Sequence, residues 1–167
     1  MIEHDIQADF CNLLYKNLEM QTIHPPYEQE LRELHCIENG DLELLEKTIP
    51  QSYDDSYNAI LAKNPIRHIK NLGIVVVTLA CRAAIRGGID PEISFSLSDA
   101  YINKLDELDN IEAVNKLMCQ AQREYTKMFY LHFSINLIPS YNYRIFQRKL
   151  HHMNHIYFYY FYSNAYT

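Results

Sequence analysis

The sequence has no tryptophan, only four glycines in 167 residues, and four cysteines without a C-x-x-C pair. Its glycines form neither a G-x-x-x-x-G-K-[ST] loop, nor a G-x-S-x-G elbow, nor a dinucleotide fingerprint, so these phosphate-binding and hydrolase signatures are excluded. The cysteines Cys11, Cys36, Cys81 and Cys119 are expected to be reduced thiols, buried as small hydrophobes. A net charge of −6 argues against nucleic-acid binding by the chain as a whole.

Long uncharged apolar runs and an export signal are also lacking. The longest apolar stretch, residues 72–80, stops at Cys81 and Arg82, well short of the roughly 18 residues of a spanning helix. The N-terminus "MIEHDIQADF" carries three acidic residues and no basic n-region. We therefore expect a cytoplasmic chain that does not enter a membrane.

Residues 26–50 predict two short helices joined by a tight turn. Pro26 is suited to the start of the first helix, Gly40 is its left-handed stop, Asp41 caps the second, and Pro50 ends it. One more short helix is predicted upstream from the spacing of the apolar residues between 10 and 18. The residues expected to face inward in the three helices are Phe10, Leu13, Leu14, Leu18, Leu31, Leu34, Ile37, Leu42, Leu45 and Ile49.

The stretch "NLGIVVVTLACRAAIR" reads at first as a β-strand because of its branched residues, but its flanks predict a helix. Asn64 is a good N-cap, Pro65 has its preferred place at the first helical position, and Gly87-Gly88 ends the segment about 22 residues later. A strand explains neither the caps nor the polar stripe on one side. The buried face is predicted to hold Ile66, Ile69, Gly73, Val76, Ala80 and Ala83.

Further helices are predicted after the double glycine. Asp90-Pro91 begins a short helical piece, Ser96 with Asp99 forms a capping box that starts a second one, and Asp109 with Glu112 repeats the device. The second piece is expected to direct Leu97, Tyr101, Leu105 and Leu108 inward. The last helix carries a regular apolar seam made of Ile111, Val114, Met118, Ala121 and Tyr125. This seam packs either against another helix of the same chain or, as a dimer seam, against a second copy.

The character of the sequence changes at residue 129. Residues 129–167 hold most of the phenylalanines and tyrosines, contain no acidic residue and show no amphipathic period. His151 and His155 have the i, i+4 spacing of zinc ligands, but no acidic residue accompanies them, and we expect no metal site. The sequence thus predicts an all-α fold of about six to seven helices in residues 1–128, followed by a poorly defined aromatic tail in residues 129–167.

Three arginines on one side of the long helix are the residues most suited to recognition. Arg67, Arg82 and Arg86 gather away from the apolar positions. They either form ion pairs with acidic residues of a neighbouring helix or meet an anionic ligand or partner. The sequence shows no pattern that would bring together a nucleophile, a base and an oxyanion hole, so we expect neither an enzyme nor a cofactor.

Several ordered pieces of the sequence resemble AraC/XylS-type transcriptional regulators. They are "NPIRHIKN" (64–71), "CRAAIRGGIDPE" (81–92) and "SLSDAYI" (96–102), preceded by "IENGDLELLEK" (37–47). The resemblance covers residues 27–128 and is to the helical segment just upstream of the DNA-binding domain of that family.

The resemblance implies a cytoplasmic transcription factor, in which this segment connects a sensory region to a pair of DNA-binding helix-turn-helix motifs. Here the aromatic tail stands where the family carries that pair, so direct DNA binding is expected to be lost. The predicted function is a non-catalytic regulatory or linker module, with a second copy or an intact family member as partner. The alternative is an independent helical domain that binds a protein, an anion or a small ligand.

Overall fold

The computed structural model describes residues 2–19, 26–50, 53 and 61–136, and in these ranges all the regular secondary structure is helical. The predicted all-α class is therefore confirmed. The chain divides into two units, Met1–His132 and Phe133–Thr167. The helices are α1 (Ile2–Glu19), α2 (Tyr27–Asn39), α3 (Leu42–Thr48), α5 (Pro65–Arg86), α6 (Pro91–Glu107) and α7 (Ile111–Asn136).

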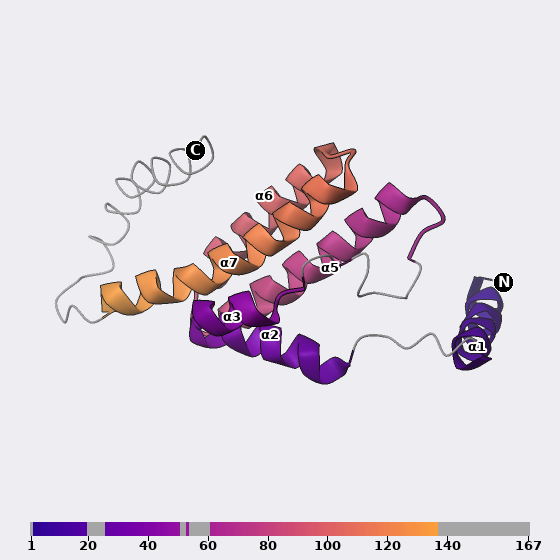
Figure 1. The fold of residues 1–167 in the computed structure, drawn as a ribbon, viewed down its shortest axis with the longest axis horizontal. Coiled ribbons are helices and arrows are strands. Elements are labelled where there is room, and N and C mark those ends of the chain that lie inside the picture. The colour runs from indigo at the N-terminus through magenta and orange to yellow at the C-terminus, as the bar shows by residue number, and fades with distance from the viewer. Residues whose placement is uncertain (1, 20–25, 51–52, 54–60, 137–167) are drawn as a thin grey trace. The chain divides into compact units, whose positions relative to one another are not determined.

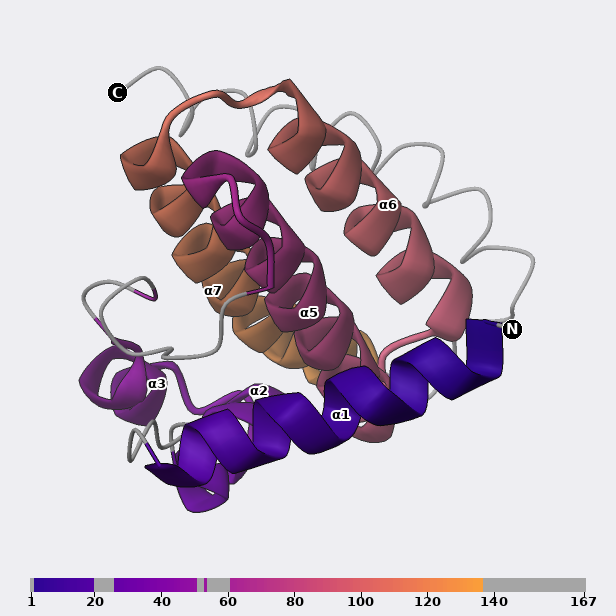
Figure 2. The same ribbon diagram turned by 90° about the vertical axis from the view of Figure 1, so that its right-hand side faces the viewer.

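Helix α5 is the central element of the core. Its predicted bounds are confirmed: the Asn64 side chain accepts a hydrogen bond from the Arg67 backbone N–H at 3.1 Å, and the helix ends at Arg86. It packs against α6 and α2, and α7 lies beside it in both ribbon views (Figures 1 and 2). Nine of its 22 residues are buried, which explains how branched residues are accommodated in a helix: burial outweighs tenths of a kcal/mol of propensity.

By length and composition alone, α5 is also long and apolar enough to cross a membrane. Within the fold, however, 56% of its most apolar window is buried by protein. The core helix of a soluble domain passes the same test, because its neighbours supply the apolar surroundings that lipid would otherwise provide.

Glycines end α5 and let α2 approach it closely. Gly88 has a φ of 99°, and the backbone N–H of Ile89 donates to the carbonyl oxygen of Ala84 at 3.1 Å, which closes the helix in a Schellman motif. A Cβ atom at Gly87 would overlap the backbone oxygen of Glu38 in α2. The double glycine therefore both stops α5 and allows the ends of α2 and α5 to meet.

Helices α2 and α3 form the predicted hairpin. Gly40 is left-handed, with a φ of 72°, and the Asp41 carboxylate accepts from the backbone N–H of Leu44 at 2.9 Å. The predicted inward stripe is wrong at Leu31, which is 44% exposed. The buried side of α2 is instead centred on Glu33, Cys36 and Ile37.

Two predicted helix starts are corrected by the structure. The segment from Asp90 onward is one continuous helix, α6, whose N-cap Asp90 accepts from the backbone N–H groups of Glu92 and Ile93. Ser96 lies inside this helix, so the predicted capping box does not form, because Asp90-Pro91 already supplies a start. The cap of α7 is Asn110, which accepts from Glu112 and Ala113, rather than Asp109.

Helix α7 completes the core and crosses the predicted domain boundary. Val114, Met118, Ala121 and Tyr125 are fully buried with side chains from α5 and α6. The helix continues to Asn136, so the change in composition at residue 129 does not end it. Residues 137–167, including His151 and His155, lie outside the described part of the chain.

Helix α1 is longer than the short helix predicted from its apolar spacing. The residues expected to face inward, Phe10, Leu13, Leu14 and Leu18, are all exposed, as is Cys11. The expectation of a buried thiol therefore fails at Cys11, whereas Cys36 and Cys81 are buried. An amphipathic pattern predicts a helix but does not say what covers its apolar face.

The two possible starts of α6 are distinguished by a pair of alanine variants. Asp90→Ala is expected to lower the free energy of unfolding by about 1 kcal/mol, because two backbone N–H groups lose their acceptor. Ser96→Ala is expected to leave it unchanged or to raise it by about 0.5 kcal/mol, because alanine is the better residue inside a helix. Urea unfolding followed by far-UV circular dichroism measures both, and a larger loss for Ser96→Ala would contradict the assigned cap.

Candidate functional site

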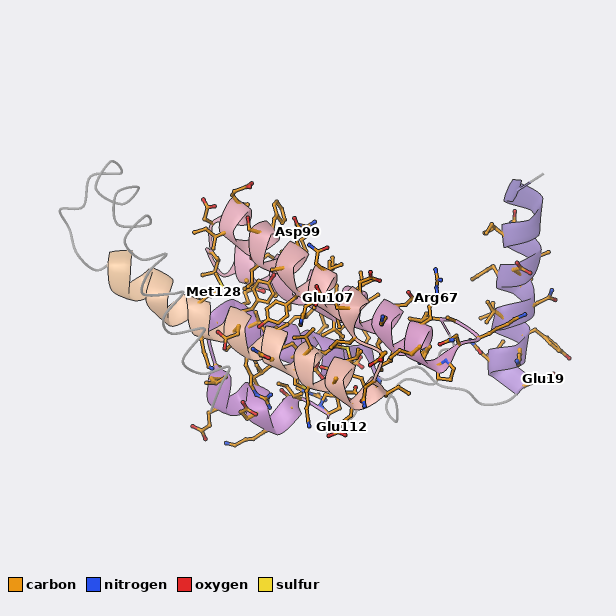
Figure 3. All side chains as sticks on the ribbon, turned by 90° about the horizontal axis from the view of Figure 1, so that it is seen from above. Glu19, Arg67, Asp99, Glu107, Glu112 and Met128 are labelled. Atoms are coloured by element: carbon orange, nitrogen blue, oxygen red, sulfur yellow. The ribbon has the colours of Figure 1, made fainter. Side chains whose placement is uncertain are left out.

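The three arginines singled out by the sequence have three different environments. The Nε atom of Arg86 lies 3.1 Å from Oε2 of Glu38 in α2. The Arg82 guanidinium lies 4.5 Å from the centre of the Phe95 ring of α6, a cation–π contact. Arg67 forms no ion pair with any residue in the described ranges and lies at the other end of α5, as labelled in Figure 3.

The arginines do not converge on one point. Arg67 and Arg86 are 19 residues apart in one helix, a separation of about 28 Å along its axis. A small anion contacts groups within a few ångströms, so it cannot bridge them. The arrangement instead suits an elongated partner that lies along the helix.

The strip of α5 between the arginines is not purely polar. Ile74 and Val75 are 40% and 45% exposed and lie between Arg67 and Arg82, at positions where the sequence indicated a polar stripe. We call this strip the outward face of α5. It consists of Arg67, Asn71, Ile74, Val75, Thr78 and Arg82.

The predicted dimer seam lies in the interior of the domain. Val114, Met118, Ala121 and Tyr125 are fully buried, and Ile111 packs at the edge of the same core. Tyr125 also donates a hydrogen bond from its hydroxyl to the backbone oxygen of Ser94 at 2.9 Å. The partner helices of this seam are therefore α5 and α6 of the same chain, which was the first of the two alternatives.

A buried polar cluster, not foreseen from the sequence, joins α2 to α7. Glu33 is only 7% exposed, and its Oε2 atom accepts from Nε2 of Gln122 at 3.1 Å. The Tyr53 hydroxyl lies 2.6 Å from Oε1 of Gln122 and 3.3 Å from Oε2 of Glu33. The backbone N–H of Tyr53 also donates to Oδ1 of Asn115, at 3.2 Å, so both the backbone and the side chain of Tyr53 are attached to α7.

Burial sets the protonation chemistry of this cluster. Desolvation raises the pKa of Glu33, and the hydrogen bonds from Gln122, Gln29 and Tyr53 oppose that rise without cancelling it. Glu30 raises the pKa further by charge repulsion. Since Gln122 and Tyr53 occupy the carboxyl group, the cluster has the character of a structural connection rather than of a catalytic acid.

An open groove of about 900 Å³ lies between α3 and the first half of α7. Its walls include Ile49, Ile111, Asn115 and Cys119. Arg123 and Glu46 form a two-point ion pair at one side of it, with N–O distances of 2.6 and 2.8 Å. Burial raises the pKa of the Cys119 thiol, so the thiol is poorly suited to act as a nucleophile.

The remaining reactive groups of the described residues are scattered. Burial also raises the pKa of Cys36, and the Sγ atom of Cys81 lies 3.4 Å from the backbone oxygen of Ser94. The Tyr101 hydroxyl is buried and has no hydrogen-bond partner among the residues that the structure describes, and burial raises its pKa as well. Among the residues placed by the structure, no three histidine, cysteine or acidic side chains lie together in a metal-binding arrangement.

Comparison with protein-family models, with curated proteins and with solved structures finds nothing that matches this chain. The resemblance to AraC/XylS-type regulators therefore remains a prediction from the quoted sequence pieces. What the described residues provide for a functional argument is the outward face of α5 and its surroundings.

The buried carboxyl group of Glu33 makes folding stability depend on pH. The pKa of Glu33 is higher in the folded state than in the unfolded chain. As the pH rises above about 4.5, the unfolded chain therefore loses this proton before the folded protein does. The free energy of unfolding falls as a result. Glu33→Gln removes that loss. The stability of this variant relative to the unaltered protein is expected to increase between pH 4.5 and 7, as measured by urea unfolding at each pH.

The matched control is Glu28→Gln, which makes the same change at an exposed position of the same helix. Because Glu28 is exposed in the first turn of α2, where a negative charge is favoured, its replacement is not expected to raise the relative stability over this range. If Glu33→Gln and Glu28→Gln gave the same pH dependence, the buried carboxyl group would not be the source of the effect.

Proposed function

We propose that the described helices form a non-catalytic regulatory module, which acts by binding another helix along the outward face of α5. The observation that carries the proposal is the exposure of Ile74 and Val75 on the most buried helix of the domain, between Arg67 and Arg82. Apolar side chains flanked by cations suit an amphipathic helix with acidic residues beside its apolar stripe.

The chemistry of the other candidate regions supports a binding role. Glu33, Gln122 and Tyr53 are occupied with one another, and the cysteines Cys36 and Cys119 are disfavoured as thiolates by burial. An arginine-bound small anion is disfavoured by the separation of about 28 Å between Arg67 and Arg86. The protein-binding form of the alternative hypothesis therefore has more support than the anion-binding form.

The resemblance to AraC/XylS-type regulators suggests what this module serves. We propose that its partner is an intact regulator of this type in the cytoplasm, and that the chain influences transcription through that regulator. The net charge of −6 favours an indirect action, since a DNA-binding surface needs an excess of basic residues.

A gel-shift experiment with three components tests this function. A purified AraC/XylS-type regulator from the same genome is bound to its promoter, and the full chain is added. The chain alone is expected to shift no DNA, and together with the regulator it is expected to change the regulator's apparent affinity by about tenfold, a coupling typical of allosteric partners.

Val75→Asp is expected to abolish the effect by placing a charge in the apolar part of the contact. Leu44→Asp is the matched control, because Leu44 is a similarly exposed apolar residue on α3. A sequence-specific shift by the chain alone, an unchanged regulator affinity, or an equal effect of the two variants would each contradict the proposal.

A further inference from the structure

Two helical faces in the described part of the chain expose apolar side chains and carry opposite charge. One is the outward face of α5. The other is on α1, where Ile6, Phe10, Leu13, Leu14 and Leu18 are between 49% and 71% exposed. An isolated amphipathic helix of 18 residues is marginally stable in water, so α1 needs a surface on which to bury this face.

The apolar residues of α1 form one stripe. Ile6, Phe10 and Leu13 follow one another at spacings of four and three, with Leu14 beside them, so they share one side of the helix. Tyr15 is as exposed as Phe10 but is rotated by about 140° from it around the axis. Phe10 therefore lies on the proposed binding side of the helix, and Tyr15 is an equally exposed aromatic residue away from that side.

Charge favours α5 as the surface that receives this stripe. The α1 sequence contains four acidic residues and one lysine, for a net charge of −3. The α5 sequence contains three arginines, one lysine and no acidic residue, for a net charge of +4. Arg67 and Arg82 are not engaged in ion pairs with other described residues, and they are available to the acidic flank of α1.

Length and chain connection are compatible with this pairing. An 18-residue helix is about 27 Å long, enough to cover the roughly 22 Å between Arg67 and Arg82 on the outward face of α5. Glu38, near the end of α2, contacts Arg86 at the end of α5. The first residue of α2, to which α1 is connected, lies about 16 Å from Glu38 along the axis of α2. The seven residues 20–26 can span at most about 24 Å, which is enough to return α1 to α5 of the same chain.

We propose that α1 packs along the outward face of α5 in the same chain, with its Ile6–Phe10–Leu13 stripe on Ile74 and Val75 and its acidic residues beside Arg67 and Arg82. A tether of this length gives an effective concentration in the millimolar range, which favours the same chain over a second copy. The inference rests on the proposed binding role of this face and names α1 as its resident occupant. An external helix would have to displace α1.

Photo-crosslinking from α5 tests the pairing without any partner protein. The full chain is prepared with p-benzoylphenylalanine in place of Val75, irradiated and digested, and the linked peptides are identified by mass spectrometry. Crosslinks are expected to residues 2–19, in a band that migrates as a monomer, with a yield independent of protein concentration. The same probe in place of Leu44 on α3 is the matched control and is expected to give no link to α1.

Two variants of α1 make the test specific to its stripe. Phe10→Asp is expected to lower the crosslink yield from position 75 about tenfold, whereas Tyr15→Asp, at the same exposure on the opposite side, leaves it unchanged. Circular dichroism is the check that both variants remain folded. Links found only in a dimer band, no links above the control, or equal effects of the two variants would each overturn the proposal.

The failure of this inference is distinguishable from failure of the proposed function. If α1 does not crosslink to α5 but the gel-shift effect is present, the outward face binds an external helix and has no internal occupant. If both proposals hold, Phe10→Asp strengthens the effect on the regulator, because displacement of α1 no longer opposes binding. If only the crosslinks are found, the face serves to hold α1.

Discussion

The burial of α5 by its neighbours is the constraint on which the rest of this fold depends. Close approach to α5 requires small residues, and a Cβ atom at Gly73 would lie 3.0 Å from a methyl group of Leu105 in α6, tighter than ordinary packing allows. At the end of α5, Gly87 leaves room for the backbone of α2. The glycines of α5 thus determine where α6 and α2 approach it. These contacts leave the outward face of α5 uncovered.

The buried cluster of Glu33, Gln122 and Tyr53 adds orientation to this apolar packing. A buried carboxyl group is costly unless it is hydrogen-bonded, so α2 and α7 are held in a register that satisfies it. Tyr53 joins the cluster through both its hydroxyl group and its backbone N–H. Apolar side chains alone tolerate small sliding movements of helices, whereas this cluster permits few, because sliding would leave a buried polar atom without a partner.

The proposed function and the further inference both follow from the one face of α5 that the core leaves open. Its exposed apolar residues lie between arginines, whose long stems can cover apolar surface while their charges stay in water. Such a face receives an acidic amphipathic helix more readily than a small anion. The tethered helix α1 and a free helix of another protein compete for this face.

Much of the helical framework follows from the sequence itself, because caps, stop glycines and apolar periods are local. Asn64, Pro65 and Gly88 determine α5 to the residue, and Gly40 with Asp41 determines the α2–α3 hairpin. The wrong prediction of a helix start at Ser96 has the same local origin. Two start signals, Asp90 and Ser96, lie less than two helical turns apart, and only the stronger one, at Asp90, begins a helix.

The candidate site was less accessible to sequence reasoning, because it depends on which faces meet. The α7 seam suited a second copy as well as an internal helix, and only the tertiary structure buries Val114 and Met118 against α5 and α6. The spacing of Glu33 with Cys36 and Ile37 on one face was a signal for a buried glutamate, but its partners outside α2 are 20 and 89 residues away. Sequence thus determined where helices begin and end, and tertiary packing decided which side chains remain exposed for binding, since exposure depends on distant neighbours.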